Sequence, residues 1–282
     1  MANKNFVEDE ISNHGLRYKD KVVLVTGGAR GIGRGCVEVF VKNGAKVAFC
    51  DILEREGKVF EEEQRLVGEA MFIPCDVTNE EQIKMVVKKT TESFGRLDCL
   101  INNAGSHPDI KMIDDFTAED FRQLLNINLV SYFLFCKHAL PHLRSSHGSI
   151  VNVSSMVGQY GASGSVTYGA TKGAILAMTK SLAVDEAVHG VRVNSISPST
   201  IKTPMLDFFL NQSENPQDAT KAAADLQTLG RMGTPEECGE ACLFLAAEGS
   251  FCTGVDILLS GGAELGYGHK SQTGNVGKGY FA

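Results

Sequence analysis

Short apolar runs alternate with longer segments of mixed polarity along most of the chain. The runs 21–25 and 46–50 are almost wholly apolar, which is typical of parallel strands that helices cover on both faces. Segments such as 34–43 and 80–94 instead place their apolar residues on one helical face. Further predicted strands follow at 70–75, 97–101, 149–153, 191–196 and 255–259. Strands that alternate with helices predict an α/β fold, in which a doubly wound parallel sheet of about seven strands is flanked by helices.

The polar positions set the expected limits of a single domain. Residues 1–19 are polar and mixed in charge, and we expect an N-terminal extension without a secretory signal, because such signals need an apolar core. The domain is expected to cover 20–262, since no repeat or low-complexity linker interrupts it. The glycine-rich residues 263–282 are expected to form a flexible tail. No apolar run is long enough to cross a membrane, so we expect a soluble protein.

Residues 202–229 change character part-way along. Their first part is apolar and includes Met205, Leu206 and Phe209, whereas residues 211–218 are polar. A segment of this kind after a strand suits a mobile lid over an apolar substrate. We therefore expect a lid over about 202–229.

Charge and cysteine content narrow the classes of function. A net charge of -7 and a pI near 5.5 argue against a nucleic-acid or anionic-membrane partner, because both need clustered Lys and Arg. The eight cysteines are scattered without CxxC pairs, and we interpret them as reduced core thiols of an intracellular protein. Cys238 and Cys242 can share a helical face, but two ligands make no metal site. We expect no metal.

The first predicted strand runs directly into a glycine-rich turn and a helix. The turn begins at Thr26 and includes Gly27, Gly31 and Gly33. Glycines at this place let the backbone approach a pyrophosphate, while the helix N-terminus supplies N–H donors and positive potential. The spacing differs from the GxGxxG of the general dinucleotide fingerprint, so the interpretation depends on the position between strand and helix. The alternative is a tight turn that binds no ligand.

The second predicted strand ends in Asp51. An acidic residue about twenty positions after a glycine turn can accept hydrogen bonds from the adenosine ribose, and it repels a 2′-phosphate. NAD is therefore favoured over NADP. Arg30 in the glycine turn tempers this preference, because a guanidinium can pair with that phosphate; the alternative for Arg30 is a solvated surface residue.

Tyr168 and Lys172 open an alanine-rich predicted helix. Residues four apart share a helical face, which places their Cβ atoms about 6 Å from one another. At this distance a lysine cation favours the tyrosine anion, which suits proton transfer near neutral pH. Ser155 follows the strand 149–153, where hydroxyls face the crevice in which doubly wound sheets bind ligands. The alternatives are a chance spacing for the pair and a polar turn residue for the serine.

Two segments that contain asparagine complete the candidate site. The sequence NNAG at 102–105 follows the fourth predicted strand and either packs against a cofactor or forms a turn. Asn126 and Asn128 lie among apolar residues of the mostly helical segment 116–142, and buried amides must be hydrogen-bonded. Most such amides only satisfy backbone groups, so Asn128 alone is a weak indication.

Together and in this order, these motifs resemble the short-chain dehydrogenase/reductase family over about residues 21–262. The matching segments are TGGARGIG at 26–33, Asp76, NNAG at 102–105, Asn128, Ser155, and Tyr168 with Lys172. The resemblance implies a Rossmann-type oxidoreductase domain. It implies that Tyr168 is the acid/base, that Ser155 fixes the substrate oxygen, and that Lys172 binds the nicotinamide ribose and favours the phenolate. Asn128 would hold a relay water.

The resemblance also implies a set of cofactor-binding residues. Asp51 would hold the adenosine ribose, Asp76 and Val77 the adenine, and Asn103 the adjoining ribose region. The full set is Gly27, Arg30, Gly31, Ile32, Gly33, Asp51, Asp76, Val77, Asn103, Ala104, Gly105, Tyr168, Lys172, Ile201 and Thr203. One position departs from the family pattern, because Ser199 stands where the family usually has glycine. If the backbone there needs an unusual angle, a serine is strained and the nicotinamide pocket shifts.

Within the family, four segments resemble the type 14 branch of the 17β-hydroxysteroid dehydrogenases. They are FRQLLNINL at 121–129, GRMG at 230–233, FCTG at 251–254 and GGAELGYG at 261–268. This resemblance implies a cytoplasmic, NAD-dependent homotetramer that oxidises the 17β-hydroxyl of steroids or another lipophilic alcohol. The predicted substrate residues are His107, Ser155, Met156, Tyr160, Met205, Leu206 and, less firmly, Phe209. Their apolar character fits a bulky lipophilic molecule, and the alternative is ordinary core and lid packing.

Two other functions stay open at this point. One is a reductase of small carbonyl compounds, which would use the same catalytic residues. The other is a non-catalytic module that binds NAD(H), against which the intact Ser155, Tyr168 and Lys172 argue.

Overall fold

Seven parallel strands form one sheet in the order β3-β2-β1-β4-β5-β6-β7. The structure is a computed structural model that describes residues 15–265. The strands are β1 (Val22–Thr26), β2 (Lys46–Asp51), β3 (Ala70–Pro74), β4 (Cys99–Asn102), β5 (Ser149–Val153), β6 (Arg192–Pro198) and β7 (Asp256–Leu259). The strands β2 and β3 are added on one side of β1, and β4 to β7 are added on its other side. A ligand crevice is therefore expected at the carboxyl ends of β1 and β4, where the strand order reverses. The predicted doubly wound α/β fold is confirmed.

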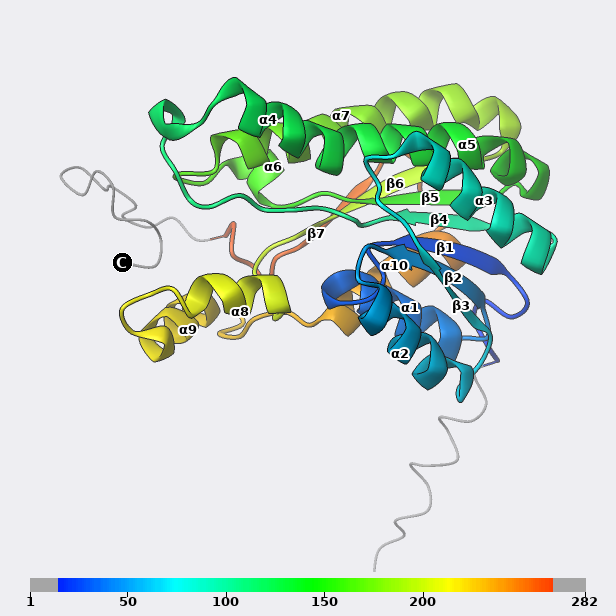
Figure 1. Cartoon of the computed structure of the whole chain (residues 1–282), viewed down its shortest axis with the longest axis horizontal. Helices are drawn as coiled ribbons and strands as arrows, with labels where there is room; N and C mark the ends of the chain where they lie inside the picture. Colours follow the sequence, from blue (N-terminus) through cyan, green and yellow to red (C-terminus); the bar gives the residue numbers. More distant parts are fainter. Residues whose placement is uncertain (1–14, 266–282) are drawn as a thin grey trace, which may run out of the picture.

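One face of the sheet is covered by α1 (Gly31–Lys42), α2 (Glu54–Arg65) and α10 (Pro235–Ala247) (Figure 1). Val23 and Val25 of β1 point to this face and are fully buried in its core. Alternate residues of a strand point to opposite faces, so a strand buried on both sides must be apolar at every position. This explains the continuous apolar run at the start of the domain.

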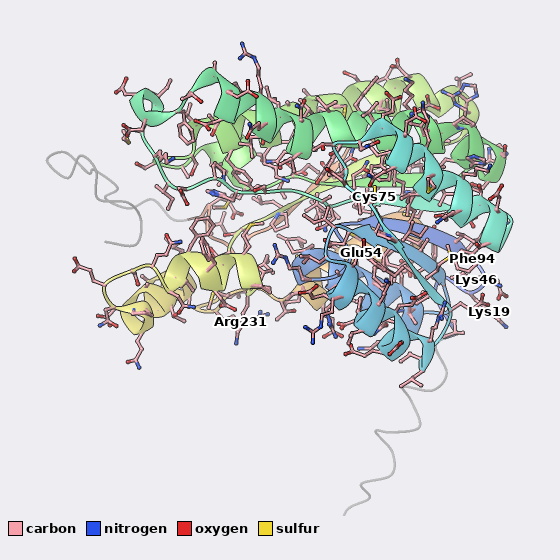
Figure 2. All side chains as sticks on the ribbon, in the orientation of Figure 1. Lys19, Lys46, Glu54, Cys75, Phe94 and Arg231 are labelled. Atoms are coloured by element: carbon pink, nitrogen blue, oxygen red, sulfur yellow. The ribbon has the colours of Figure 1, made fainter. Side chains whose placement is uncertain are left out.

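The opposite face is covered by α3 (Glu80–Phe94), α5 (Ser131–Ser146) and α7 (Val166–Glu186) (Figure 1). Val22 and Leu24 of β1 belong to this second core. Figure 2 shows side chains filling the space between the sheet and both helix layers, with Cys75 in the interior. All cysteines in the described range are free thiols, as expected, and none but Cys252 reaches solvent.

Helix starts follow the capping signals in the sequence. Thr234 and Glu237 form a capping box at the start of α10, with Pro235 in the first turn. Asn79 caps α3 by accepting from the backbone N–H groups of Glu81 and Gln82. These bonds satisfy N–H groups that no helical carbonyl reaches.

The predicted helical segment 116–142 is interrupted where Asn128 lies. It consists of α4 (Ala118–Leu125), a π-helical turn η3 (Asn126–Val130) and α5. The extra residue in a π-helical turn changes the direction of nearby backbone groups, and such turns are frequent at functional sites. No sequence signal indicated it. Two short 3₁₀ turns are η2 (Ile113–Asp115) and η4 (Ala187–His189).

The predicted lid region contains two helices, α8 (Pro204–Leu210) and α9 (Pro216–Asp225). Both project from one end of the molecule, apart from the two helix layers (Figure 1). Leu210, Ala219 and Ala223 form a small core of their own. The segment therefore packs as a separate unit, and its movement as a lid stays a prediction.

The predicted limits of the domain fall partly outside the described residues. The extension was expected to end at residue 19, but Tyr18 is buried and its ring lies 5.3 Å from that of Phe40 in α1. The expected flexible tail lies outside residues 15–265 from position 266 onward.

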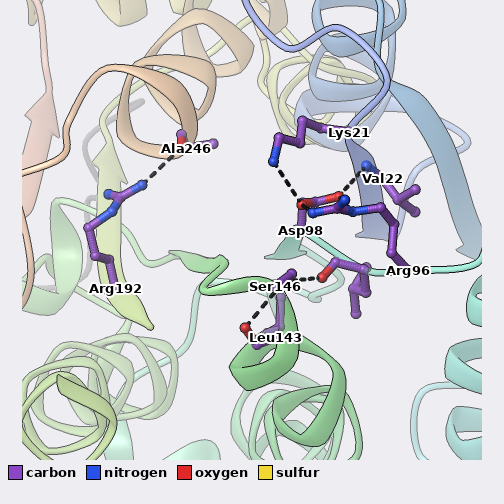
Figure 3. Close-up of polar contacts among 9 residues, drawn as sticks. Lys21, Val22, Arg96, Asp98, Leu143, Ser146, Arg192 and Ala246 are labelled. Atoms are coloured by element: carbon purple, nitrogen blue, oxygen red, sulfur yellow. Dashed lines mark hydrogen bonds and ion pairs between the residues drawn. The ribbon is translucent and has the colours of Figure 1, made fainter. Parts of the chain in front are cut away.

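The amino-terminal edge of the sheet lies opposite the end from which α8 and α9 project. Figure 2 places Lys19, Lys46 and Phe94 together at this edge. Here the buried Asp98 accepts hydrogen bonds from the backbone N–H of Val22 and from the side chain of Arg96 (Figure 3).

Candidate active site

Ser155, Tyr168 and Lys172 meet at the carboxyl edge of the sheet, as their spacing predicted. Ser155 follows β5, and the other two residues lie in the first part of α7. The Lys172 Nζ atom lies 5.7 Å from the centre of the Tyr168 ring. The Ser155 hydroxyl accepts from the backbone N–H of Val157 at 3.2 Å, and it lies close enough to the Tyr168 phenol to lower the pKa of that phenol. The sequence thus predicted which side chains come together.

Lys172 is a buried amine held by main-chain atoms. Its Nζ donates to the Val153 carbonyl at 2.8 Å, and its side chain is almost fully enclosed. The Ser154 hydroxyl donates to the carbonyl of Lys172 at 2.8 Å. Burial lowers the pKa of Lys172 to about 7, because desolvation disfavours the charged form.

Tyr168 differs from the expectation that its lysine neighbour lowers the phenol pKa. Burial raises the pKa of Tyr168 to about 12, while the hydrogen bond from Ser155 opposes part of that rise. Desolvation therefore has the largest effect on the pKa of the phenol in the protein alone. The phenol is therefore protonated at neutral pH and can donate a proton. A ligand that binds beside Tyr168 must favour the phenolate for the reverse step.

Asn128 has its whole amide occupied by protein partners. Its oxygen accepts from the Ser106 N–H at 2.8 Å, and its nitrogen donates to the Ser106 carbonyl at 2.9 Å and to Thr171 Oγ1 at 3.1 Å. The side chain therefore fixes the loop after β4 against α7. The role of Asn128 in holding a relay water stays a prediction.

His107 forms the wall of the site next to the tyrosine. Its ring centre lies 4.2 Å from that of Tyr168 and 5.2 Å from that of Phe209 in α8. The Nδ1 atom contacts the Pro108 carbonyl at 2.6 Å, and a carbonyl can only accept, so Nδ1 carries the proton. Burial lowers the pKa of His107. The neutral ring leaves Nε2 as an acceptor beside the phenol.

The other predicted substrate residues are less enclosed. Met156 is half-buried, whereas Tyr160 and Met205 are exposed. Leu206 packs against the small core of α8 and α9. The structure thus brings His107 and Ser155 to the tyrosine and Phe209 to His107, and it leaves Tyr160 at the surface.

The glycine turn has the backbone geometry of a cofactor cradle. Gly27 has φ +65, and an added Cβ would lie 2.8 Å from Ala104 Cα; at Gly33 it would lie 2.1 Å from the Gly27 carbonyl oxygen. No larger residue fits at either position. Arg30, the residue before α1, makes no side-chain cap, so the first N–H groups of α1 are open to an anionic ligand. These features fit a dinucleotide pyrophosphate.

Asp51 is held in a fixed position at the end of β2. Its carboxylate accepts from the backbone N–H of Ala29 at 3.1 Å and from that of Leu53 at 3.2 Å. Both bonds orient the carboxylate beside the glycine turn, where an adenosine ribose would lie. Arg30 and Arg55 line a cavity of about 770 Å³ on the outer side of this turn, so cations are also near.

Asn103 and Asp76 are engaged with the protein. The Asn103 amide donates to the carbonyls of Thr26 at 2.9 Å and Gly27 at 3.0 Å, so it supports the glycine turn. Asp76 is exposed and accepts from the N–H and hydroxyl of Thr78, and Val77 is buried. Gly105 lies close to Asn103 and to Asn128, and a Cβ added at Gly105 would be 3.4 Å from the Oδ1 atom of Asn128.

The segment after β6 is unstrained at Ser199. The non-glycine residues with positive φ in the described range are Asp20 and His147, so the serine adopts an ordinary backbone angle. Ile201 is buried and pairs with Gly233. Thr203 caps α8, and its methyl group would lie 3.5 Å from a Cβ added at Gly31. Of the two residues predicted to contact the nicotinamide, Thr203 therefore lies beside the glycine turn.

Sequence reasoning missed Ser154 and Thr171. Ser154 fixes the carbonyl of Lys172, and Thr171 accepts from Asn128 while its hydroxyl donates to the Tyr168 carbonyl at 2.8 Å. The one available signal was their position as polar neighbours of the predicted catalytic residues.

Residues 15–265 contain neither a metal-binding cluster nor a membrane-spanning helix. No three His, Cys, Asp or Glu side chains gather there at metal-binding distances. Within the same range, no helix has the length and apolar character needed to span a bilayer.

Comparison with known proteins identifies the family. A family model described as "Enoyl-(Acyl carrier protein) reductase" matches residues 27–264. The chain belongs to the short-chain dehydrogenase/reductase family. It is therefore an oxidoreductase of a family that uses NAD or NADP.

Named relatives in this family include L-fucose dehydrogenases and a hydroxysteroid dehydrogenase. The chain is 50% identical over 254 residues to L-fucose dehydrogenase of Oryctolagus cuniculus, which covers 90% of this chain and 88% of the relative. It is 38% identical over 255 residues to 3-alpha-(or 20-beta)-hydroxysteroid dehydrogenase of Mycobacterium bovis, with 90% and 93% covered. The aldohexose dehydrogenase of Thermoplasma acidophilum superposes with a TM-score of 0.83 at 30% identity, covering 91% of this chain and 99% of the other. The predicted steroid substrate is not supported by the L-fucose dehydrogenases, of which two are 50% and 48% identical to this chain.

Proposed function

We propose that the protein is an NAD-dependent dehydrogenase that oxidises a hydroxyl group of a sugar such as L-fucose. The observation that carries the proposal is the juxtaposition of Ser155, Tyr168 and Lys172, with the Nζ atom of the lysine 5.7 Å from the tyrosine ring. The identity to L-fucose dehydrogenases and the structural similarity to an aldohexose dehydrogenase support the substrate class.

Each residue has a distinct part in this chemistry. The Ser155 hydroxyl and the Tyr168 phenol hydrogen-bond the substrate oxygen, and Tyr168 accepts its proton in oxidation or returns it in reduction. Lys172, when charged, favours the phenolate that accepts the proton. NAD, when bound, accepts the hydride from the substrate carbon. His107 and Phe209 limit the access of water to the phenol from the α8 side.

The neutral His107 favours a polyhydroxylated substrate. Its ring centre lies 4.2 Å from that of Tyr168, and its unprotonated Nε2 can accept a hydrogen bond from a second hydroxyl of a sugar. A site that hydrogen-bonds a substrate hydroxyl strongly rejects an analogue that lacks it, because the acceptor is then left unpaired. A sugar therefore satisfies this wall of the site better than an apolar ring does.

A steroid or another lipophilic alcohol is the second candidate. Met205 and Phe208 of α8 are exposed apolar side chains, and such side chains next to a site suit a lipophilic ligand. The 38% identity to a hydroxysteroid dehydrogenase supports it as well.

A kinetic panel separates these candidates. Initial rates of reduced-cofactor formation are measured with L-fucose, D-aldohexoses, a 17β-hydroxysteroid and short secondary alcohols. The proposal expects the highest kcat/KM with a sugar. A steroid that exceeds every sugar would establish the second candidate, and absence of turnover with all of them would favour the module that only binds NAD(H).

NAD preference is assigned to the charge of Asp51. Its fixed carboxylate would lie close to a 2′-phosphate and repel it. Asp51→Asn removes the charge and keeps the size, so we expect the ratio of NAD to NADP efficiency to fall about tenfold or more. An unmodified protein that uses NADP equally well would contradict the assignment.

The homotetramer and the cytoplasmic location are proposals that rest on the resemblance to the type 14 branch. Sedimentation of the purified chain tests the first, and fractionation of cells that express it tests the second.

A further inference from the structure

A buried amide joins the end of α9 to the sheet. The side chain of Gln227 is only 4% exposed. Its nitrogen donates to the carbonyls of Ala223 and Ala224, at the end of α9. Its oxygen accepts from the hydroxyl of Ser199 at 3.0 Å. Ser199 directly follows β6 and is bound to β7 through its backbone N–H, which donates to the Leu259 carbonyl at 2.9 Å.

The segment that this amide holds has few other ties to the body of the protein. The apolar side chains of α8 and α9 pack on one another, and Leu210, Ala219 and Ala223 belong to neither of the two cores that cover the sheet. Figure 1 shows both helices projecting beyond the sheet. The position of the segment over the site therefore depends on the bonds at its two ends.

Those two ends are attached differently. At the start, main-chain bonds join Lys202 to Gly233 at 2.9 Å and Gly233 to Thr200 at 3.0 Å. At the end, the Leu229 N–H donates to the Gly261 carbonyl at 3.0 Å. The bond between Ser199 and Gln227 is added to this main-chain attachment and joins the half-buried Ser199 to the buried Gln227. A buried acceptor that loses its donor is costly, so this bond gives the closed position a specific advantage.

The segment contacts the reactive group through two rings. Phe209 of α8 lies 5.2 Å from His107, and His107 lies 4.2 Å from Tyr168. A shift of α8 therefore removes Phe209 from the wall of the site without moving the catalytic residues themselves.

We propose that Ser199 and Gln227 are a positioning pair that holds α8 and α9 closed over the site and so sets the affinity for the substrate. The proposal rests on the proposed function, because the ligand enclosed is its sugar substrate. Ser199 stands where the family pattern has glycine, which has no hydroxyl, so this attachment belongs to this chain and is not required by the fold.

Hydrogen–deuterium exchange of the full chain without ligand tests the attachment alone. Ser199→Ala and Gln227→Met each remove the bond, and we expect residues 204–226 to exchange about tenfold faster, with the sheet unchanged. Ser213→Ala is the matched control, because its hydroxyl donates to Leu210 within the same segment. Unchanged exchange in Ser199→Ala, or an equal increase throughout the chain, would overturn the proposal.

Steady-state kinetics with NAD and the best sugar then test the consequence. Ser199→Ala should raise the substrate KM several-fold with kcat within about twofold, since binding is weakened and the chemical step is not. Ser199→Thr keeps the hydroxyl and should restore both the KM and the exchange rate. If hydrogen exchange increases but the substrate KM does not change, the proposed role of the pair in substrate affinity is overturned. Failure of the unmodified protein to oxidise any sugar would refute the proposed function, and the exchange result would still decide whether the pair holds the segment.

Discussion

The two edges of the sheet each bury a charged side chain, and they treat it in opposite ways. At the amino edge, Asp98 is 3% exposed and is bound by Lys21 at 3.3 Å, Arg96 at 2.6 Å and the N–H of Val22 at 2.9 Å (Figure 3). At the carboxyl edge, Lys172 is 4% exposed and its Nζ donates to the Val153 carbonyl. One buried charge has ionic partners, and the other is held by a neutral carbonyl.

This difference in ionic partners indicates that Asp98 serves stability and that Lys172 serves the chemistry of the site. A buried carboxylate with complementary cations and hydrogen bonds joins the strands it touches. A buried amine without an ionic partner has a lowered pKa, here about 7, and residues of this kind cluster at functional sites. Changes at the carboxyl edge should therefore alter activity most, and changes at the amino edge should alter stability.

The largest effect is expected from Tyr168→Phe. The ring and its contact with His107 are retained, but the group that exchanges the proton is lost, so turnover should fall by a factor on the order of 10² or more. Binding of NAD, measured by calorimetry on the same variant, should be nearly unchanged. Near-normal turnover with NAD bound would show that the tyrosine is not the acid/base.

The second-largest effect is expected in the pH dependence of stability when Lys172 is replaced by methionine. The folded pKa of Lys172 is about 7 against an ordinary 10.5, so between these values the unfolded chain binds more protons and the free energy of unfolding rises with pH. From pH 7 to pH 10 the unmodified protein should gain on the order of 3 kcal/mol relative to Lys172→Met. Urea unfolding at several pH values measures it. If the free energy of unfolding changed with pH in the same way in both proteins, the claim that the amine is buried without an ionic partner would be contradicted. Lys172→Met should also lose activity, but this loss does not enter the comparison.

The smallest effect is expected from Asp98→Asn at the amino edge. The amide keeps the size of the side chain but loses the charge that Lys21 and Arg96 neutralise, and unfolding should become easier by about 2 kcal/mol. The turnover number should stay within about twofold, because the residue lies at the opposite edge from Tyr168. A large loss of turnover in a folded variant would break the separation between the two edges.

The sequence predicted the parts of the molecule that local pattern determines. Apolar runs such as 22–25 are buried on both faces, so they identified the strands. The order of the motifs predicted that Ser155, Tyr168 and Lys172 lie at the same edge of the sheet. The spacing of four residues accounts for the proximity of Tyr168 and Lys172, because helical geometry places both side chains on one face.

The environment of those residues was not predictable from the same pattern. The raised pKa of Tyr168 depends on burial by segments distant in sequence, including the loop that carries His107. The saturation of Asn128 needs the position of Ser106, and the π-helical turn around it has no sequence signature. The same holds for the bond from Ser199 to Gln227, since only the folded chain shows that a serine in place of glycine finds a buried acceptor.

The most direct test of the contrast between the two edges is a titration of Lys172 in the protein without cofactor. Carbon-13 labelling of the lysine side chains allows their protonation to be followed by NMR, and Lys172→Met assigns the signal. The account predicts half-protonation near pH 7, as burial without an ionic partner requires. A Lys172 signal that titrates near its ordinary value of 10.5 would contradict it.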